Sequence, residues 1–186
     1  MKQRSRSRKK FKILSRRVVF SKGPIHLVDC RVAMPGGRVL SRQIMEHPGS
    51  VVILPRVRPD AYLLVRQFRF AARDWLWELP AGGVELGESL QHAARREMIE
   101  ETGFRPRHLK KLISFYSSPG VSGEKMHLFL AWNFSPAFAR GDDDEEIEIR
   151  EFSRRQIERM IRNQTIVDAK TITGFFYLQA NRTDLS

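Results

Sequence analysis

Three glutamates, Glu97, Glu100 and Glu101, lie within five residues of a segment that predicts a helix over residues 89–102. When residues 90–101 are placed on a helix at about 100° per residue, the apolar side chains fill one arc of about 140°. Glu97 and Glu101 fall inside this arc, and Glu100 lies at its edge. The face that should pack against the rest of the protein therefore carries carboxylates.

Carboxylates on a buried helix face need a cationic partner, because burying them unpaired costs several kcal/mol each. Two interpretations meet this need: salt bridges to the neighbouring Arg95 or Arg96, or a bound divalent cation. Carboxylate oxygens suit a hard cation such as Mg²⁺, whose coordination is commonly completed by water and by phosphate oxygens of a substrate. A merely solvated Glu/Arg surface does not explain carboxylates that point with the apolar stripe.

The segment directly before this helix, ELPAGGVELGE at 78–88, contains Pro80, Gly82, Gly83 and Gly87. It predicts a short loop in which backbone can approach a ligand and free amides can face an anion. A glycine-rich loop alone is a weak signal. A glycine-rich loop that leads into an acid-bearing helix indicates a site for phosphate and metal.

Segments rich in β-branched and aromatic residues predict strands on both sides of this helix. The first three, separated by Gly-Pro and Pro-Gly-Gly, predict a small antiparallel meander. The predicted strands cover residues 12–20, 25–34, 38–46, 50–57, 62–70, 109–117, 127–134 and 146–152.

Ser89 is the predicted N-cap of the acid-bearing helix, and Gly103 is its predicted left-handed terminator. Two more helices are predicted near residues 153–163 and 168–181. Strands and helices thus interleave, which favours an α/β fold with a mixed sheet covered by helices over a helical bundle or a pure β-sandwich.

The chain of 186 residues is long enough for one well-buried domain, and its formal net charge is +12. Residues 1–17 account for nine of these charges, because they hold nine Lys and Arg and no acid. Such a tail could bind RNA phosphates or a membrane surface, although blocks of like charge are more often solvated, disordered ends.

Cys30 is the single cysteine, which leaves no internal disulfide and agrees with a reducing compartment. No apolar run approaches the roughly 20 residues that span a bilayer, and the start MKQRSRSRKK lacks the apolar stretch of a secretory signal. We therefore expect a cytoplasmic protein with no membrane partner.

Residues 82–104 resemble the Nudix box, the signature of the Nudix hydrolases, written G-x5-E-x7-R-E-U-x-E-E-x-G-U with U a bulky apolar residue. Every fixed position is present, and the last U is aromatic. The matching residues are Gly82, Glu88, Arg96, Glu97, Met98, Glu100, Glu101, Gly103 and Phe104.

Within that family the chain is similar to the ADP-ribose pyrophosphatase group over roughly residues 18–180. The similarity rests on ELPAG at 78–82, LLVRQFRF at 63–70, an SPG turn at Pro119 and DAKTITGFFYL near the end. The resemblance implies an α/β/α sandwich and a divalent metal, usually Mg²⁺ with Mn²⁺ as a substitute. It also implies hydrolysis of a nucleoside diphosphate sugar; ADP-ribose would give AMP and ribose 5-phosphate.

By that resemblance, the metal is held by the side chains of Glu97, Glu100 and Glu101 and by the backbone carbonyl of Ala81. Glu100 is also a candidate catalytic residue, as is Arg96, which would pair with a carboxylate of the cluster and orient it.

A catalytic base is expected from the acidic run 141–146, since larger family members often draw it from a loop after the box. Glu145 aligns best, and Glu146 and Asp143 compete with it. The alternative is that this acidic loop is simply solvated.

Three residues are candidates for binding the substrate. Arg69 could fork onto a phosphate, and Glu78 could accept hydrogen bonds from a ribose or a base. Pro119 and its turn could shape the pocket for the terminal ribose. Arg69 and Glu78 could instead be ordinary surface charges.

We expect a basic, disordered tail at 1–17, a β subdomain at 18–48 and the Nudix domain at 49–186. Members of the group are commonly homodimers whose N-terminal strands help form the partner's site, a role open to residues 12–46. Two alternatives stay open: another nucleotide substrate, such as GDP-mannose, a UDP-sugar or a dinucleotide, and binding or processing of RNA ends through the tail.

Overall fold

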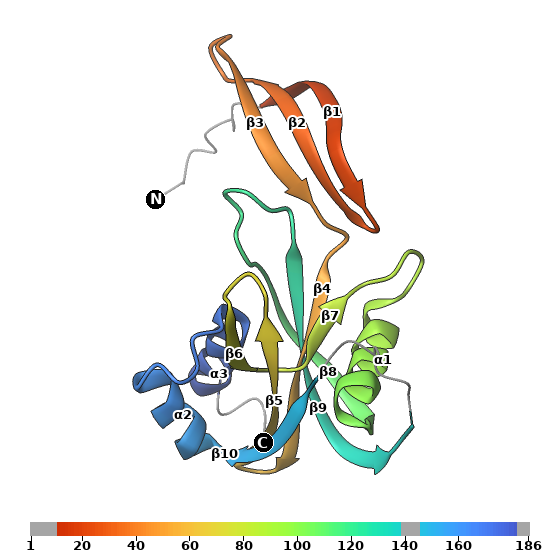
Figure 1. Ribbon diagram of the computed structural model, residues 1–186, viewed down its shortest axis with the longest axis vertical. Coiled ribbons are helices and arrows are strands. Elements are labelled where there is room, and N and C mark those ends of the chain that lie inside the picture. The colour runs from red at the N-terminus through yellow and green to blue at the C-terminus, as the bar shows by residue number, and fades with distance from the viewer. Residues whose placement is uncertain (1–10, 139–145, 182–186) are drawn as a thin grey trace, which may run out of the picture. The chain divides into compact units, whose positions relative to one another are not determined.

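The computed structural model describes residues 11–138 and 146–181 (Figure 1). The chain divides into two compact units. One comprises residues 1–48 with 118–124, and the other comprises residues 49–117 with 125–186. The segment 118–124, which the sequence assigned to the main domain, thus belongs to the first unit.

The first unit is a three-stranded antiparallel sheet in the order β1-β2-β3, formed by β1 (Lys12–Lys22), β2 (Ile25–Ala33) and β3 (Val39–Glu46). Lys22 pairs with Ile25, so Gly23 and Pro24 alone make the first turn, and Gly23 takes the φ of 56° that favours glycine. The segment 118–124 joins β3, since the amide of Met45 donates to the carbonyl of Val121 (2.8 Å).

Strand β1 begins inside the segment that the sequence assigned to a basic tail. Lys12 pairs with Ala33 and Arg17 pairs with Asp29, so residues 12–17 lie in the sheet. The reason is that the strand signal of this segment overlaps its charges, and pairing with β2 satisfies its backbone. Residues 1–10 of the predicted tail lie outside the described residues.

The second unit holds a seven-stranded mixed sheet along the path β10-β5-β4-β9-β8, with β6 paired to β5 and β7 paired to β4. Strands β4 and β9 run parallel, and the other pairs are antiparallel. The strands are β4 (Ser50–Arg58), β5 (Ala61–Arg69), β6 (Asp74–Glu78), β7 (Ala81–Gly83), β8 (Phe104–Tyr116), β9 (Lys125–Pro136) and β10 (Glu148–Ser153).

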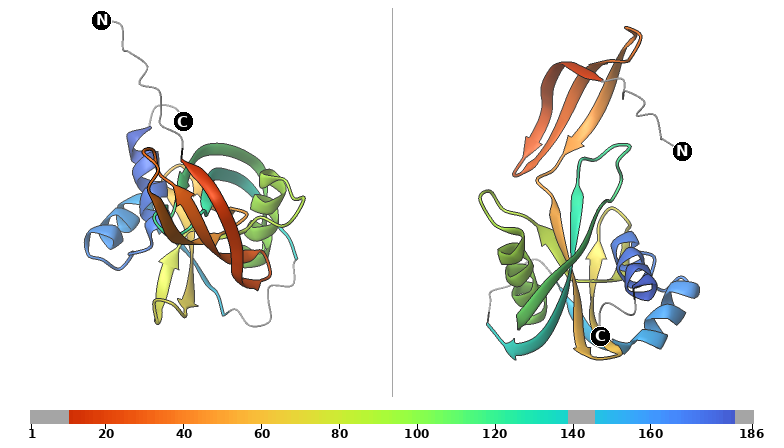
Figure 2. Two further views of the ribbon diagram at one scale, coloured as in Figure 1. Left: turned by 90° about the horizontal axis from the view of Figure 1, so that it is seen from above. Right: turned by 180° about the vertical axis from the view of Figure 1, so that it is seen from behind.

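In the described part of the chain, three helices cover the two faces of this sheet: α1 (Leu90–Thr102), α2 (Arg154–Arg162) and α3 (Ala169–Ala180). Ala93, Ala94 and Met98 of α1 pack in one core cluster, while α2 and α3 contribute to another on the opposite face. Figure 2 shows α1 on one side of the sheet and α2 and α3 on the other. The predicted mixed sheet between helical layers, preceded by a small meander, is confirmed.

The ends of α1 are those that the sequence predicts. The Ser89 side chain accepts a hydrogen bond from the amide of His92 (3.2 Å), which caps the first turn. Gly103 ends the helix in the left-handed conformation at φ 70° and donates to the carbonyl of Ile99 (2.8 Å). These two residues fix the segment that carries the three glutamates.

Two short strands were absent from the sequence prediction. β6 follows β5 as a hairpin, and β7 occupies residues 81–83, where a loop was predicted. Glycine is rare in strands, but pairing of Ala81, Gly82 and Gly83 with β4 supplies backbone hydrogen bonds that local sequence cannot reveal. Among the described residues, no helix is long and apolar enough to cross a membrane.

Candidate active site

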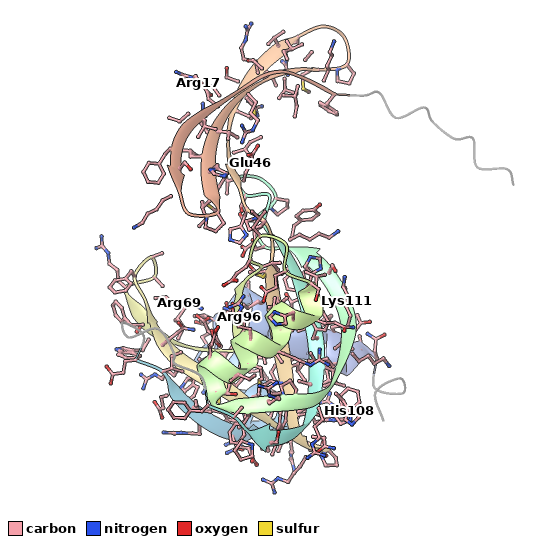
Figure 3. All side chains as sticks on the ribbon, turned by 90° about the vertical axis from the view of Figure 1, so that its right-hand side faces the viewer. Arg17, Glu46, Arg69, Arg96, His108 and Lys111 are labelled. Carbon is pink, nitrogen blue, oxygen red and sulfur yellow. The ribbon has the colours of Figure 1, made fainter. Side chains whose placement is uncertain are left out.

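A cavity of about 560 Å³ lies in the second unit, between the acid-bearing face of α1, strand β7 and the end of β5. It brings together six of the predicted site residues: two arginines, three glutamates and one alanine whose backbone carbonyl is a predicted metal ligand. Its lining includes Arg69, Ala81, Arg96, Glu97, Glu100 and Glu101. Figure 3 labels Arg69 and Arg96, the two arginines of this lining.

The helix face predicted from the wheel is confirmed. Glu97 and Glu101 are 9% and 8% exposed, beside Ala93, Ala94 and Met98, which are fully buried. The side chain of Glu100 is 34% exposed, as expected at the edge of the arc. The carboxylates of α1 therefore face the body of the protein.

Arg96 donates hydrogen bonds to three carboxylates, those of Glu88 in the loop and of Glu97 and Glu100 in α1. Its Nη1 donates to Glu97 (2.7 Å) and to Glu100 (3.0 Å), while Nε and Nη2 fork onto Glu88 at 3.0 and 2.9 Å. Nη2 also donates to the carbonyl of Gly83 (2.8 Å). One guanidinium thus ties α1 to the loop before it.

Glu88 stabilises this loop. It also accepts hydrogen bonds from the amide of Glu85 (3.1 Å) and lies 2.7 Å from Nδ1 of His92. Hydrogen bonds from Arg96, followed by those of His92 and Glu85, outweigh burial and lower the pKa of Glu88 to about 2. The carboxylate is therefore ionised throughout the physiological range.

Glu97 lies against the backbone of β7. A Cβ placed on Gly82 would stand 2.1 to 2.2 Å from the Glu97 carboxyl group, so only glycine leaves room for this side chain. Burial raises the pKa of Glu97, and the opposing charge and hydrogen bond of Arg96 do not cancel that effect. Beside it, Glu101 accepts a hydrogen bond from the amide of Ala81 (3.2 Å).

The donor set at this wall fits a hard divalent cation in its chemistry. Three carboxylates gather along one wall of the cavity, where the backbone of Ala81 and Gly82 also lies, and oxygen donors are what Mg²⁺ prefers. Within the described residues, no three acidic, histidine or cysteine side chains already converge on one point as ligands. Glu97 and Glu100 both accept hydrogen bonds from Nη1 of Arg96.

Arg69, at the end of β5, is held by Glu78 at the end of β6. Nε of Arg69 donates to both carboxylate oxygens (3.0 and 3.2 Å), and Nη2 donates to Oε2 (2.7 Å). Glu78 is 1% exposed, whereas the Arg69 side chain keeps 36% of its exposure and lines the cavity. The cavity wall therefore presents the arginine, with the glutamate behind it.

Glu78 binds a second cation from α3. Nζ of Lys170 donates to Oε2 of Glu78 and to Oδ1 of Asp168 (3.0 Å). Burial by itself would raise the pKa of Glu78, but the hydrogen bonds of Arg69 and the charge of Lys170 lower it overall. Glu78 is thus a buried, fully ionised link between two cations.

Among the described residues, two predicted site residues are not in this lining. Glu78 lies behind Arg69, and Pro119 lies in the segment 118–124 of the other unit. Glu145 and its competitor Asp143 lie outside the described residues, whereas Glu146 is described and exposed.

Sequence reasoning missed several residues that line the cavity, among them Thr102, Ile147 and Ile149. The alternation in the segment 146–152 predicted a strand but gave no sign that its start reaches the cavity. Lys170 and its link to Glu78 were also missed, because the two residues are 92 positions apart.

Comparison with known proteins identifies the family. The NUDIX domain model matches residues 46–174. The ADP-ribose pyrophosphatase of Bacillus subtilis (strain 168) is 34% identical over 170 residues, covering 90% of this chain and 92% of that protein. The methanol dehydrogenase activator of Bacillus methanolicus is 33% identical over 163 residues, covering 87% and 88%.

A solved structure shares the fold. The crystal structure of an ADP compounds hydrolase matches with a TM-score of 0.82 and 22% identity, covering 95% of this chain and 96% of that one. The chain belongs to the NUDIX domain family, which confirms the resemblance drawn from residues 82–104.

Proposed function

We propose that this chain uses Mg²⁺ to hydrolyse the pyrophosphate bond of ADP-ribose or a related nucleoside diphosphate sugar, giving a nucleoside monophosphate and a sugar phosphate. By its family it is a Nudix pyrophosphohydrolase, and the proposal concerns its substrate and its metal. The observation that carries it is the cavity that joins the three α1 carboxylates to Arg69. The named activity of the Bacillus subtilis relative supports the choice of substrate.

Four groups would hold the metal: the carboxylates of Glu97, Glu100 and Glu101 and the backbone carbonyl of Ala81. A divalent cation bound there would supply the positive charge that lets a diphosphate approach carboxylates, and it would polarise the phosphoryl group. Arg96 orients Glu97 and Glu100 through its shared Nη1. If the bound cation drew Glu97 or Glu100 away from Arg96, the guanidinium would still be held by Glu88.

Arg69, which also lines the cavity, would bind the diphosphate, since a guanidinium suits phosphate oxygens. Glu78 acts through Arg69 in this proposal, and not by the direct contact with ribose or base expected from the sequence. Its 1% exposure supports this reassignment.

Glu145 is the proposed base, on sequence grounds, and Ile147 two residues later lines the cavity. Glu145→Gln should lower kcat about 100-fold at saturating Mg²⁺, which is the usual range for a general base. Glu146→Gln is the matched control, and equal losses in both variants, or none in Glu145→Gln, would reject this assignment.

A panel of nucleotide sugars tests the proposal. ADP-ribose, GDP-mannose and UDP-sugars are incubated with the protein and Mg²⁺, and monophosphate release is measured. ADP-ribose should give the highest kcat/KM, Glu101→Gln should abolish release, and chelation of the metal should do the same. No release from any nucleotide sugar would defeat the proposal.

The second part of the proposal is a homodimer formed through the subdomain expected at 18–48 together with the start of β1. Ile13, Val18 and Phe20 of β1 are 63%, 45% and 59% exposed. Exposed apolar side chains on one strand support an interaction surface there. Light scattering should give twice the chain mass, and Phe20→Glu should give a monomer.

We also propose a cytoplasmic location, supported by the single cysteine, Cys30, which is buried. Cell fractionation of the tagged full chain tests it. Recovery in a membrane or extracellular fraction would contradict the assignment.

A further inference from the structure

Lys170 stands in a position that helix stability does not explain. It is the second residue of α3, where the helix dipole disfavours a cation. It is also 8% exposed, so its ammonium is largely removed from water. The unfavourable helix dipole and the loss of hydration must therefore be offset by the partners of the ammonium group.

The partners of Lys170 are carboxylates on two different elements. Its Nζ donates to Asp168, the N-cap of α3, and to Glu78 at the end of β6. Lys170 does not line the cavity. Its contact with Glu78 links it to Arg69, which does line the cavity.

The same turn of α3 fixes the backbone beside Glu78. Oγ1 of Thr171 accepts a hydrogen bond from the amide of Leu79 (2.8 Å) and donates to Oδ2 of Asp168 (2.6 Å). Thr171 is fully buried. The first turn of α3 therefore holds the Glu78 carboxylate through Lys170 and the next peptide through Thr171.

The orientation of Arg69 depends on this carboxylate. Three donors converge on Oε2 of Glu78: Nε and Nη2 of Arg69, and Nζ of Lys170. The two arginine nitrogens form a planar fork, so the plane of the carboxylate sets the plane of the guanidinium. Lys170 is thus one of the three donors that hold Oε2 of Glu78.

We propose that Lys170 is a positioning residue that holds Glu78, and through it aims the Arg69 guanidinium at the diphosphate of the substrate. This inference rests on the proposed function, because it takes Arg69 as a phosphate ligand. It assigns to α3 a part in substrate affinity, although α3 contributes no residue to the cavity lining.

The first test separates positioning from mere stability. Lys170→Met removes the charge at similar length, and we expect KM for ADP-ribose to rise at least about fivefold with kcat within about twofold of wild type. Lys170→Arg, which keeps a cation, should stay within about twofold in KM. If Lys170→Met does not fold, Lys170→Gln carries the same test.

Arg154→Met is the matched control. Arg154 is also a cation in the first turn of a helix, its Nε donates to Glu158 (3.0 Å), and it does not line the cavity. Its loss should lower the midpoint of thermal unfolding without changing KM. An equal rise of KM in Arg154→Met would overturn the proposal.

A double-mutant cycle decides whether Lys170 acts through Arg69. In an Arg69→Met background, Lys170→Met should change KM by less than about twofold, because the group that it positions is gone. The same fold-change in both backgrounds, or an unchanged KM in the single variant, would overturn the proposal while leaving the proposed function intact.

Failure of the proposed function gives a different result. Wild-type protein would then release no monophosphate from any nucleotide sugar. Calorimetric binding of inorganic pyrophosphate in the presence of Mg²⁺ replaces KM as the readout of the cycle in that case. Equal affinity of wild type and Lys170→Met would then overturn the role of Lys170.

Discussion

Glu78 and Glu97 are both nearly excluded from solvent beside the same cavity, but their surroundings compensate them differently. Glu78 binds Arg69 and Lys170, and its pKa lies below the ordinary value although burial opposes this. Glu97 is bound by Arg96, which also binds Glu88 and Glu100. Burial therefore prevails at Glu97 and raises its pKa.

Under the proposed function, this difference would separate a carboxylate that builds the site from one that binds the metal. Glu78 has two cationic partners, Arg69 and Lys170, of which Lys170 is shared with Asp168, so its charge is compensated within the fold and it suits a fixed scaffold. A carboxylate that shares one cation with two others still has charge to be neutralised, and Glu97 therefore suits a divalent metal. Four changes break or sharpen this comparison.

Of these four changes, Glu97→Gln should have the largest effect on catalysis. We expect kcat to fall about 100-fold to 1,000-fold, which corresponds to several kcal/mol of metal-dependent stabilisation. Without added metal, the free energy of unfolding at neutral pH should not fall, because ionisation of a buried acid with a raised pKa opposes folding as the pH rises. A variant that keeps a tenth of wild-type turnover, or that is clearly destabilised without metal, would contradict this assignment.

Glu78→Gln should give the opposite pattern. The amide leaves Arg69 and Lys170 without their shared anion, and loss of one partner of a buried ion pair costs about 3–5 kcal/mol. Urea titration should show this loss for Glu78→Gln and not for Glu97→Gln. Equal stability of the two variants would remove the distinction between them.

Gly82→Ala should displace Glu97 without unfolding the protein. The three atoms nearest the added Cβ all belong to the end of the flexible Glu97 side chain, so we expect the carboxylate to swing away and kcat to fall about tenfold or more. Gly83→Ala is the reference, since its Cβ meets no atom within 4 Å. A loss no larger for Gly82→Ala than for Gly83→Ala would show that the position of Glu97 does not depend on this contact.

Glu88→Gln should have the smallest effect, visible in acid. The pKa of Glu88 is lowered from 4.5 to about 2, so this group stabilises the folded state above pH 4.5 and loses that contribution as the pH falls toward 2. At neutral pH the wild type should be about 1–2 kcal/mol more stable than Glu88→Gln. The gap should close between pH 4.5 and 2 in denaturant titrations, and a constant gap would contradict it.

Local patterns in the sequence were enough to predict α1 and its acidic face. Ser89 and Gly103 mark the ends of this helix, and a period of 3.6 residues places Glu97 and Glu101 with Ala93 and Met98. These signals act within one or two turns, so they need no knowledge of the rest of the fold. The predicted strands and the α/β class follow from the same kind of short-range pattern.

Other elements depend on partners that are distant in the chain. The three residues of β7 contain two glycines and form a strand only because β4 lies beside them. The strand pattern of residues 12–20 predicted β1, and its pairing with β2 shows that residues 12–17 belong to the sheet and not to the tail that their charge suggested. Likewise, Pro119 lies with the first unit, a grouping that no local pattern indicates.

The sequence by itself determined that carboxylates must face inward on one helix and that a glycine-bearing segment precedes them. Only the tertiary structure decided how each carboxylate is compensated. Arg96 is shared among three glutamates, while Glu78 receives Arg69 from β5 and Lys170 from α3, 92 residues away. Charge compensation is a short-range effect in space, and the fold alone decides which charges become neighbours.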